Sequence, residues 1–162
     1  MPATPPREVL LRPTTAADVA WLYGLEVDPE SNRSAGTKPR DWPTFEARWA
    51  VILADPGAAG VTPRVILADG EPVGSVNISP WEGADAMGYW IAREHWGRGI
   101  ATRAVGLMLA EFRRRPLFAT ASAANAASVR VLEKHGFTLV SRVSTPETAR
   151  TVARETVMMV LR

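Results

Sequence analysis

Residues 96–102 (Trp-Gly-Arg-Gly-Ile-Ala-Thr) open the stretch of sequence that decides the fold, which extends to Phe137. A strand-like segment, Met87–Ala92, precedes this run, and a helix-like segment, a second strand and a second helix follow it. Two glycines one residue apart let the backbone approach a ligand closely, and the first amides of the following helix have no helical partner. The positive end of the helix dipole lies behind those amides. The order of elements therefore predicts the phosphate-binding loop of a nucleotide site.

The two commonest nucleotide motifs fit this stretch poorly. Gly97 and Gly99 match only two of the three glycines of a dinucleotide fingerprint. A Rossmann site also needs an acidic residue near the end of the next strand, and residues 117–122 contain none. A P-loop needs Gly-Lys followed by Ser or Thr, which does not occur in the sequence. A nicotinamide-dependent reductase is therefore disfavoured, and so is a P-loop site.

Three runs of residues agree together with another kind of nucleotide site. They are residues 88–91 (Gly-Tyr-Trp-Ile), the loop 96–102, and 125–128 (Asn-Ala-Ala-Ser) followed by 134–137 (Lys-His-Gly-Phe). In this order and spacing they resemble the acetyl-CoA-binding core of the GNAT superfamily of N-acetyltransferases, most closely its ribosomal-protein-alanine (RimJ/RimL-type) branch. The pyrophosphate loop of that family has the form Gln/Arg-x-x-Gly-x-Gly/Ala, and Gly99-Ile100-Ala101 matches its second half. Trp96 stands at the first position, a departure that is common in this branch.

This resemblance implies an α/β fold with an α+β type of mixed sheet, the GNAT acyl-CoA N-acyltransferase fold, with about seven strands and four helices packed on both faces. It implies an enzyme that moves an acetyl group from acetyl-CoA to a primary amine by direct attack. The backbone amide near Ile91 is the implied donor to the oxyanion, and Ser128 is the implied hydroxyl that assists the leaving thiolate. The implied acetyl-CoA contacts are Ile91, Gly97, Arg98, Gly99, Ile100, Ala101, Thr102 and Asn125.

Some of these residues also have a purely structural explanation. Asn125 suits a helix cap, with Ser128 completing a local set of hydrogen bonds. Residues three apart share a helix face, so both can also face one ligand. Tyr89 and Trp90 alternate across a strand, so we expect one to pack in the core while the other faces a helix or cleft.

The general base is the weakest match to the family. Many relatives have a Glu two residues before the Gly-Tyr-Trp run, where this chain has Ala86. Asp85 is adjacent, and a bulge near Gly83 or Gly88 would turn its carboxylate into the place that Ala86 leaves empty. Asp85 is therefore the first candidate base, and further candidates lie on expected loops: Glu26, Glu30 and Glu82. The missing carboxylate also favours the alternative of a catalytically silent CoA-binding sensor or scaffold.

The acceptor amine is expected to enter between two loops, residues 26–41 and about 144–150, because these correspond to the substrate loops of the family. Loops of this kind set specificity. The first loop carries Asp28 and Glu30, which attract an amine, but also cationic residues, which attract an acidic group: Arg33, Lys38 and Arg40. A protein N-terminus and a small amine, such as an antibiotic or a metabolite, both stay open as acceptors.

Length and composition are consistent with one globular domain, expected over residues 8–162 after a short extension at 1–7. The chain has no cysteine and two histidines, which excludes disulfides and a cysteine nucleophile and disfavours a metal site. No apolar run suits a membrane span or signal core, so we expect a cytoplasmic protein. Residues 113–115 form the one basic run, at a helix end without interleaved aromatics, so no nucleic-acid partner is expected. A homodimer is left open.

Hydrophobic periodicity and turn residues predict the remaining elements. Asp69-Gly70 is a strong hairpin signal, and Gly136 suits a left-handed helix cap. The expected strands are 9–12, 64–68, 73–78, 87–92, 117–122, 137–143 and 151–161. The expected helices are 16–25, 43–54, 100–112 and 125–135, and residues 26–41 are expected to be a loop.

Overall fold

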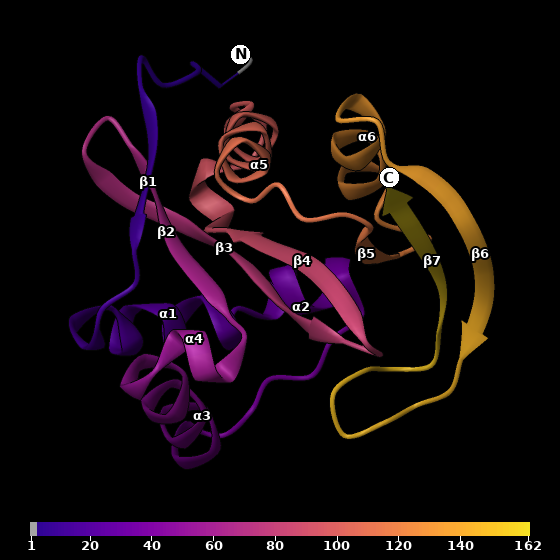
Figure 1. Ribbon diagram of the computed structural model, residues 1–162, viewed down its shortest axis with the longest axis horizontal. Coiled ribbons are helices and arrows are strands. Elements are labelled where there is room, and N and C mark those ends of the chain that lie inside the picture. Colours follow the sequence, from indigo (N-terminus) through magenta and orange to yellow (C-terminus); the bar gives the residue numbers. More distant parts are fainter. Residues whose placement is uncertain (1–2) are drawn as a thin grey trace.

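A seven-stranded mixed sheet forms the centre of the molecule in the computed structural model, which describes residues 3–162 (Figure 1). Its strand order is β1-β2-β3-β4-β5-β7-β6. Only β4 and β5 are parallel neighbours, and every other adjacent pair is antiparallel. The strands are β1 (Val9–Pro13), β2 (Thr62–Ala68), β3 (Glu71–Trp81), β4 (Ala84–Ile91), β5 (Leu117–Ser122), β6 (Thr138–Thr145) and β7 (Arg154–Leu161).

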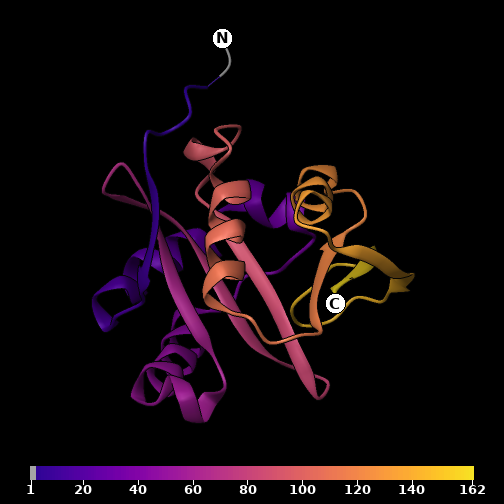
Figure 2. The same cartoon turned by 45° about the horizontal axis from the view of Figure 1, so that its top comes forward.

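Helices cover both faces of this sheet (Figures 1 and 2). One hydrophobic cluster joins α5 and α6 to the strands, through residues such as Met108 and Leu132, and a second cluster lies between α1 and α3. The helices are α1 (Val19–Glu26), α2 (Pro29–Ala35), α3 (Trp42–Ala54), α4 (Pro56–Ala59), α5 (Ile100–Glu111) and α6 (Ala126–Lys134). The mixed α/β fold expected from the sequence is confirmed.

The helix count is a correction, because α2 lies inside the segment predicted to be a loop. Asp28 caps α2 by accepting a hydrogen bond from the Ser31 amide (2.8 Å), and Pro29 occupies the first turn. Gly36 ends the helix with a φ of 67°, the left-handed conformation that glycine adopts easily. The polar composition of this segment hid these start and stop signals. The same Asp-Pro and Gly arrangement produces the short helix α4.

The parallel pair β4–β5 separates soon after it begins. The two strands pair only at Asp85 with Leu117 and at Ala86 with Phe118. The remainder of β4, from Met87 to Ile91, pairs with β3 alone. One edge of β4 therefore presents its backbone groups to the space between the two strands, and the chain leaves this end of β4 through the glycine loop into α5.

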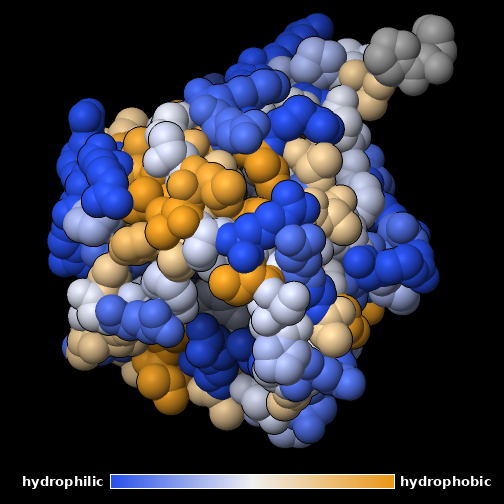
Figure 3. Space-filling model, turned by 90° about the vertical axis from the view of Figure 1, so that its right-hand side faces the viewer, coloured by the Kyte–Doolittle hydropathy of each residue, from blue (hydrophilic) through white to orange (hydrophobic). Residues whose placement is uncertain are grey.

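The outer surface bears on three further expectations. Within residues 3–162 no helix is long and apolar enough to span a membrane. Hydrophobic side chains gather on the side of the molecule that carries the edge strand β6 (Figure 3), and the exposed ones on β6 are Leu139, Val140 and Val143. The single-domain boundaries, the homodimer and the cytoplasmic location stay predictions, and residues 1–2 of the N-terminal extension lie outside the described part.

Candidate active site

A cavity of about 870 Å³ lies where β4 and β5 separate, between the glycine loop and the helices α1–α3. This volume is within the range of small-molecule sites. All of the predicted acetyl-CoA contacts line it: Ile91, Gly97, Arg98, Gly99, Ile100, Ala101, Thr102 and Asn125. Ser128 lines it as well, and Asp85 does not.

The glycine loop has the backbone geometry of an anion site. Gly97 and Gly99 have φ values of 74° and 72°, and Gly99 is the N-cap of α5. A Cβ added to either glycine would meet no protein atom within 4 Å, so the space beside them is open. The amides at the start of α5 therefore face a space that a phosphate can enter. The Arg98 side chain turns toward the N-terminal segment, because its guanidinium contacts His95 Nδ1 (2.8 Å) and Thr4 O (2.7 Å).

The residue predicted to carry the oxyanion donor, Ile91, lies on the free edge of β4. The Ala92 amide donates to Val73 O on β3 (2.8 Å). Because successive residues of a strand turn their backbone groups to opposite sides, the Ile91 amide points away from β3, toward the space between β4 and β5. The Ile91 carbonyl on the same side accepts a hydrogen bond from Trp96 Nε1 (2.9 Å). Trp96 thus fixes the end of β4 from the position where the family commonly has Gln or Arg.

Asn125 caps the helix α6, and its side chain also lies where it can contact a ligand in the cavity. Its Oδ1 accepts a hydrogen bond from the Ser128 amide (3.2 Å) and caps α6. Its Nδ2 has no partner among residues 3–162, and the side chain lines the cavity. The cap therefore leaves one amide donor available to a ligand.

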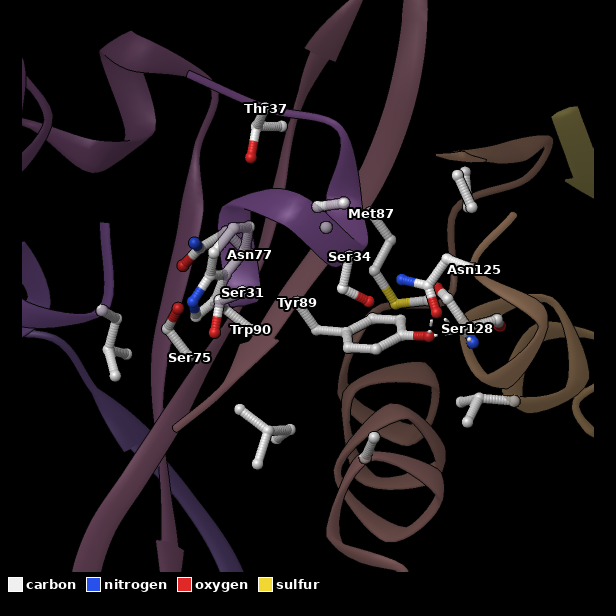
Figure 4. A pocket seen from close by; sticks show the side chains of 18 of the residues that line it. Ser31, Ser34, Thr37, Ser75, Asn77, Met87, Tyr89, Trp90, Asn125 and Ser128 are labelled. Atoms are coloured by element: carbon white, nitrogen blue, oxygen red, sulfur yellow. Dashed lines mark hydrogen bonds between the residues drawn. The ribbon is translucent and has the colours of Figure 1, made fainter. Parts of the chain in front are cut away.

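Tyr89 is a functional candidate whose role the sequence did not reveal. Its hydroxyl lies 2.7 Å from Ser128 Oγ, where either oxygen can donate (Figure 4). Burial raises the pKa of Tyr89, and the hydrogen bond to Ser128 partly opposes that rise. The phenol is therefore protonated near neutral pH. The Tyr89 hydroxyl also lies 3.3 Å from the Ser128 carbonyl, to which it can donate. When Tyr89 instead donates to Ser128 Oγ, the Ser128 O–H is free next to the cavity.

The candidate base Asp85 does not lie at the site. The register between β3 and β4 is continuous from Trp81–Ala84 to Gly74–Ile91, so no bulge turns Asp85 toward the cavity. Its carboxylate is buried and accepts two hydrogen bonds from Arg114, at 2.6 and 2.9 Å. The alternation of a regular strand, which the sequence already favoured for Asp85, keeps it on the side of the C-terminal end of α5.

The other candidate carboxylates are divided between cavity and surface. Glu82 lies at the exposed tip of the β3–β4 hairpin, and Glu30 pairs with Arg33. Glu26 lines the cavity, and no other carboxylate in the described chain does so. Its Oε1 already accepts hydrogen bonds from the amide and the guanidinium of Arg40, and it forms an ion pair with the guanidinium of Arg150.

Neutral polar side chains line the cavity on the opposite side of the sheet from Tyr89. Asn77 Oδ1 and Trp90 Nε1 are buried and have no hydrogen-bond partner among residues 3–162. Figure 4 shows both beside Ser75 and Ser31, apart from the group of Tyr89, Ser128 and Asn125. A buried polar atom without a partner is costly, so these atoms are suited to bind a substrate or water. Tyr89 packs against the hydrophobic cluster that joins α5 and α6 to the strands, and Trp90 faces α2. Both side chains nevertheless line the cavity.

Comparisons with known proteins agree with this arrangement. Residues 8–138 match the model of the acetyltransferase (GNAT) domain. Similar solved structures include RimJ of Mycobacterium smegmatis with CoA-disulfide (23% identity, TM-score 0.71, 94% of this chain and 81% of that one). They also include RimL, the ribosomal L7/L12 alpha-N-protein acetyltransferase (17%, 0.78, 96% and 90%). A third is spermidine N-acetyltransferase of Vibrio cholerae with CoA and spermine (15%, 0.76, 94% and 94%).

A comparison with curated protein sequences finds no significant match. The three structures share the fold with this chain, and their low identities carry no statement about its acceptor. The family model, in contrast, covers most of the sequence, including the glycine loop and Asn125 to Ser128. The chain therefore belongs to the GNAT acetyltransferase family, as the resemblance implied.

Proposed function

We propose that this protein transfers an acetyl group from acetyl-CoA to a primary amine. One observation carries the proposal. The cavity opens where β4 leaves β5, with the glycine loop at one end and the paired hydroxyls of Tyr89 and Ser128 beside it. A catalytically silent sensor needs the loop but has no use for this hydroxyl pair.

The residues that hold acetyl-CoA in this proposal act mainly through the backbone. The amides of the loop and of the first turn of α5 bind the pyrophosphate. The free edge of β4 offers further amides along the pantetheine arm, and Asn125 Nδ2 adds a side-chain donor. The residues that line the phosphate end of the cavity thus fit the co-substrate. Residues 3–162 contain no cluster of potential metal ligands.

The chemical step requires a neutral amine, a donor for the carbonyl oxygen and a proton for the departing sulfur. The Ile91 amide stabilises the oxygen that gains negative charge during attack. Tyr89 and Ser128 deliver a hydrogen bond or proton to the CoA thiolate. Because Glu26 is occupied by arginines, a water held near Asn77 accepts the amine proton, or the amine enters already neutral.

The test is release of CoA thiol from acetyl-CoA in the presence of a panel of amines. The panel contains peptides that begin with Ala, Ser or Met, a polyamine, an aminoglycoside and short amino acids. We expect thiol release that depends on the acceptor, together with a product about 42 Da heavier than the amine, which is the mass that acetylation adds. Calorimetric binding of acetyl-CoA without thiol release from any amine would instead favour the sensor.

A further inference from the structure

The acceptor end of the cavity, defined here as the part lined by α1–α3 and the β6–β7 connection, carries more positive than negative charge. Four arginines line it: Arg40 before α3, Arg48 on α3, Arg150 in the β6–β7 connection and Arg154 at the start of β7. Glu26 is the one carboxylate there among residues 3–162. Nearby Lys38 is neutralised by Glu147.

Hydrogen bonds and ion pairs within the protein satisfy only some of these arginines. Arg40 and Arg150 share Glu26, each with a guanidinium nitrogen 3.1 Å from Oε1. Arg154 donates to the Ala35 carbonyl, while its Nε is buried without a partner. Arg48 has no hydrogen bond or ion pair within the described chain. The Arg48 side chain is exposed at the rim of the cavity, where desolvation and then the like charge of Arg40 lower its pKa and the charge of Glu26 partly opposes this. Its guanidinium thus stays charged, faces the cavity and is free to bind an anionic partner.

This charge lies away from the part of the cavity that suits the phosphates of acetyl-CoA. In Figure 1 the helices α5 and α6 are at the top of the molecule, whereas α3 and the β6–β7 connection are at the bottom. Arg48 lies on α3 and Arg150 in the β6–β7 connection, and Arg40 and Arg154 lie directly beside these two elements in the chain. The group they attract is therefore part of the second substrate.

We propose that the acceptor is a primary amine that also carries a carboxylate or phosphate group, and that this anionic group binds Arg48 between Arg40 and Arg150. The inference rests on the proposed function and names its substrate class. A purely cationic acceptor such as a polyamine meets like charges here. The arginines also disfavour the protonated form of the amine itself, which supplies the neutral nucleophile where no free carboxylate is available.

A matched series of amines tests the substrate class. 4-Aminobutanoate, its amide and 1,4-diaminobutane have the same reach and end in an anion, a neutral group and a cation. An aminoalkyl phosphate tests phosphate in place of carboxylate. C-terminally amidated peptides beginning Ala-Asp, Ala-Asn and Ala-Lys form the parallel arm, which distinguishes a peptide source of the anion from a small-molecule source. We expect kcat/KM for the anionic member of at least one arm to exceed that of its neutral partner by about tenfold or more, and the preference to weaken as salt rises.

Three variants connect this preference to Arg48. Arg48→Gln is expected to reduce the ratio of anionic to neutral kcat/KM about fivefold, mainly through the KM of the acceptor, while calorimetric acetyl-CoA affinity stays the same. Arg48→Lys keeps the charge and should retain most of the ratio. Arg113→Gln removes an equivalent charge at the exposed end of α5, outside the cavity, and should leave the ratio unchanged.

Each remaining outcome contradicts one claim or the other. If in both arms the anionic member is acetylated no faster than its neutral or cationic partner, the anionic acceptor is overturned while the proposed function is supported. Thiol release from none of the amines would contradict the proposed function. In that case calorimetric titration of 4-aminobutanoate and 1,4-diaminobutane into protein saturated with acetyl-CoA decides the inference, because equal or tighter binding of the diamine would refute it.

Discussion

The two ends of the cavity are built in different ways. The cofactor end uses residues close together in the chain, and much of its chemistry comes from backbone groups of residues 91–102 with the cap at Asn125. The acceptor end uses side chains from α1, α3 and the β6–β7 connection. Its central contact joins Arg150 to Glu26, and the Lys38 amide also donates to the Arg150 carbonyl (2.8 Å). Changes at the first end should therefore affect acetyl-CoA, and changes at the second should affect the amine.

The largest expected effect is at the junction of the two ends. Ser128→Ala and Tyr89→Phe should each lower kcat by up to about a hundredfold, with a smaller change in the KM for acetyl-CoA, because a leaving-group donor acts mainly in the transition state. If the two hydroxyls act as one unit, the double variant should be no more than about threefold slower than the slower single variant. Ser144→Ala, an exposed serine on β6, is the control. If the kcat losses of the two single variants multiply in the double variant, the two hydroxyls act independently.

The second effect concerns the anchoring of α1, which carries Glu26. Hydrogen bonds from Arg12 and then from Thr15 outweigh burial and lower the pKa of Asp18 to about 2, from its usual value of 3.8. A lowered carboxyl pKa stabilises the fold fully above about pH 4, and this contribution disappears as pH falls toward 2. Asp18→Asn should therefore cost about 2 kcal/mol of unfolding free energy at pH 7.

Urea unfolding of Asp18→Asn between pH 3 and pH 7 measures that loss, with Glu71→Gln as a control for removing an exposed carboxylate. The difference from the parent protein should shrink as the pH falls below 4. Because α1 carries Glu26 at the acceptor end of the cavity, Asp18→Asn should also change the KM of the acceptor amine and leave the affinity for acetyl-CoA unchanged. A difference that does not depend on pH would contradict the charge-based explanation.

The third effect isolates the cofactor end. Gly99→Ala should reduce acetyl-CoA affinity by at least about tenfold, or about 1.4 kcal/mol, because a methyl group enters the space beside the loop. The backbone strain of an alanine at positive φ is about 1 kcal/mol in the protein itself. Gly70→Ala places the same strain in the β2–β3 hairpin, at φ 85° with open space around it. Calorimetry should show a loss for Gly99→Ala only, and equal affinities would refute the phosphate loop.

The smallest effect is expected at Asp85. Asp85→Asn weakens its pair with Arg114, whose side chain is 68% exposed, so the loss of stability should be below about 1 kcal/mol. We expect kcat/KM to stay within about twofold of the parent. A loss of about a hundredfold or more with intact acetyl-CoA binding would make Asp85 the general base and contradict its position outside the cavity.

Local signals explain why most of the fold could be predicted from the sequence. Asp69-Gly70 forms the expected hairpin, and Gly136 adopts a positive φ (87°) after α6 as expected. Both depend on backbone conformations that few residues tolerate. The helix α2 was missed because its cap residues lie in a polar segment, which composition alone assigns to a loop. Its Ser31 nevertheless becomes buried against the cavity.

The sequence by itself determined the family and the glycine loop, and it predicted which residues line the cavity near that loop, because backbone recognition of phosphate requires glycines and a helix start within a few consecutive residues. Only the tertiary structure decided which side chains meet in the cavity and which are held outside it. Tyr89 reaches Ser128, Glu26 is shared by Arg40 and Arg150, and Asp85 is held by Arg114. These contacts join elements that are far apart in the chain and are fixed by how the sheet separates and how the helices pack on it. No local pattern encodes that arrangement.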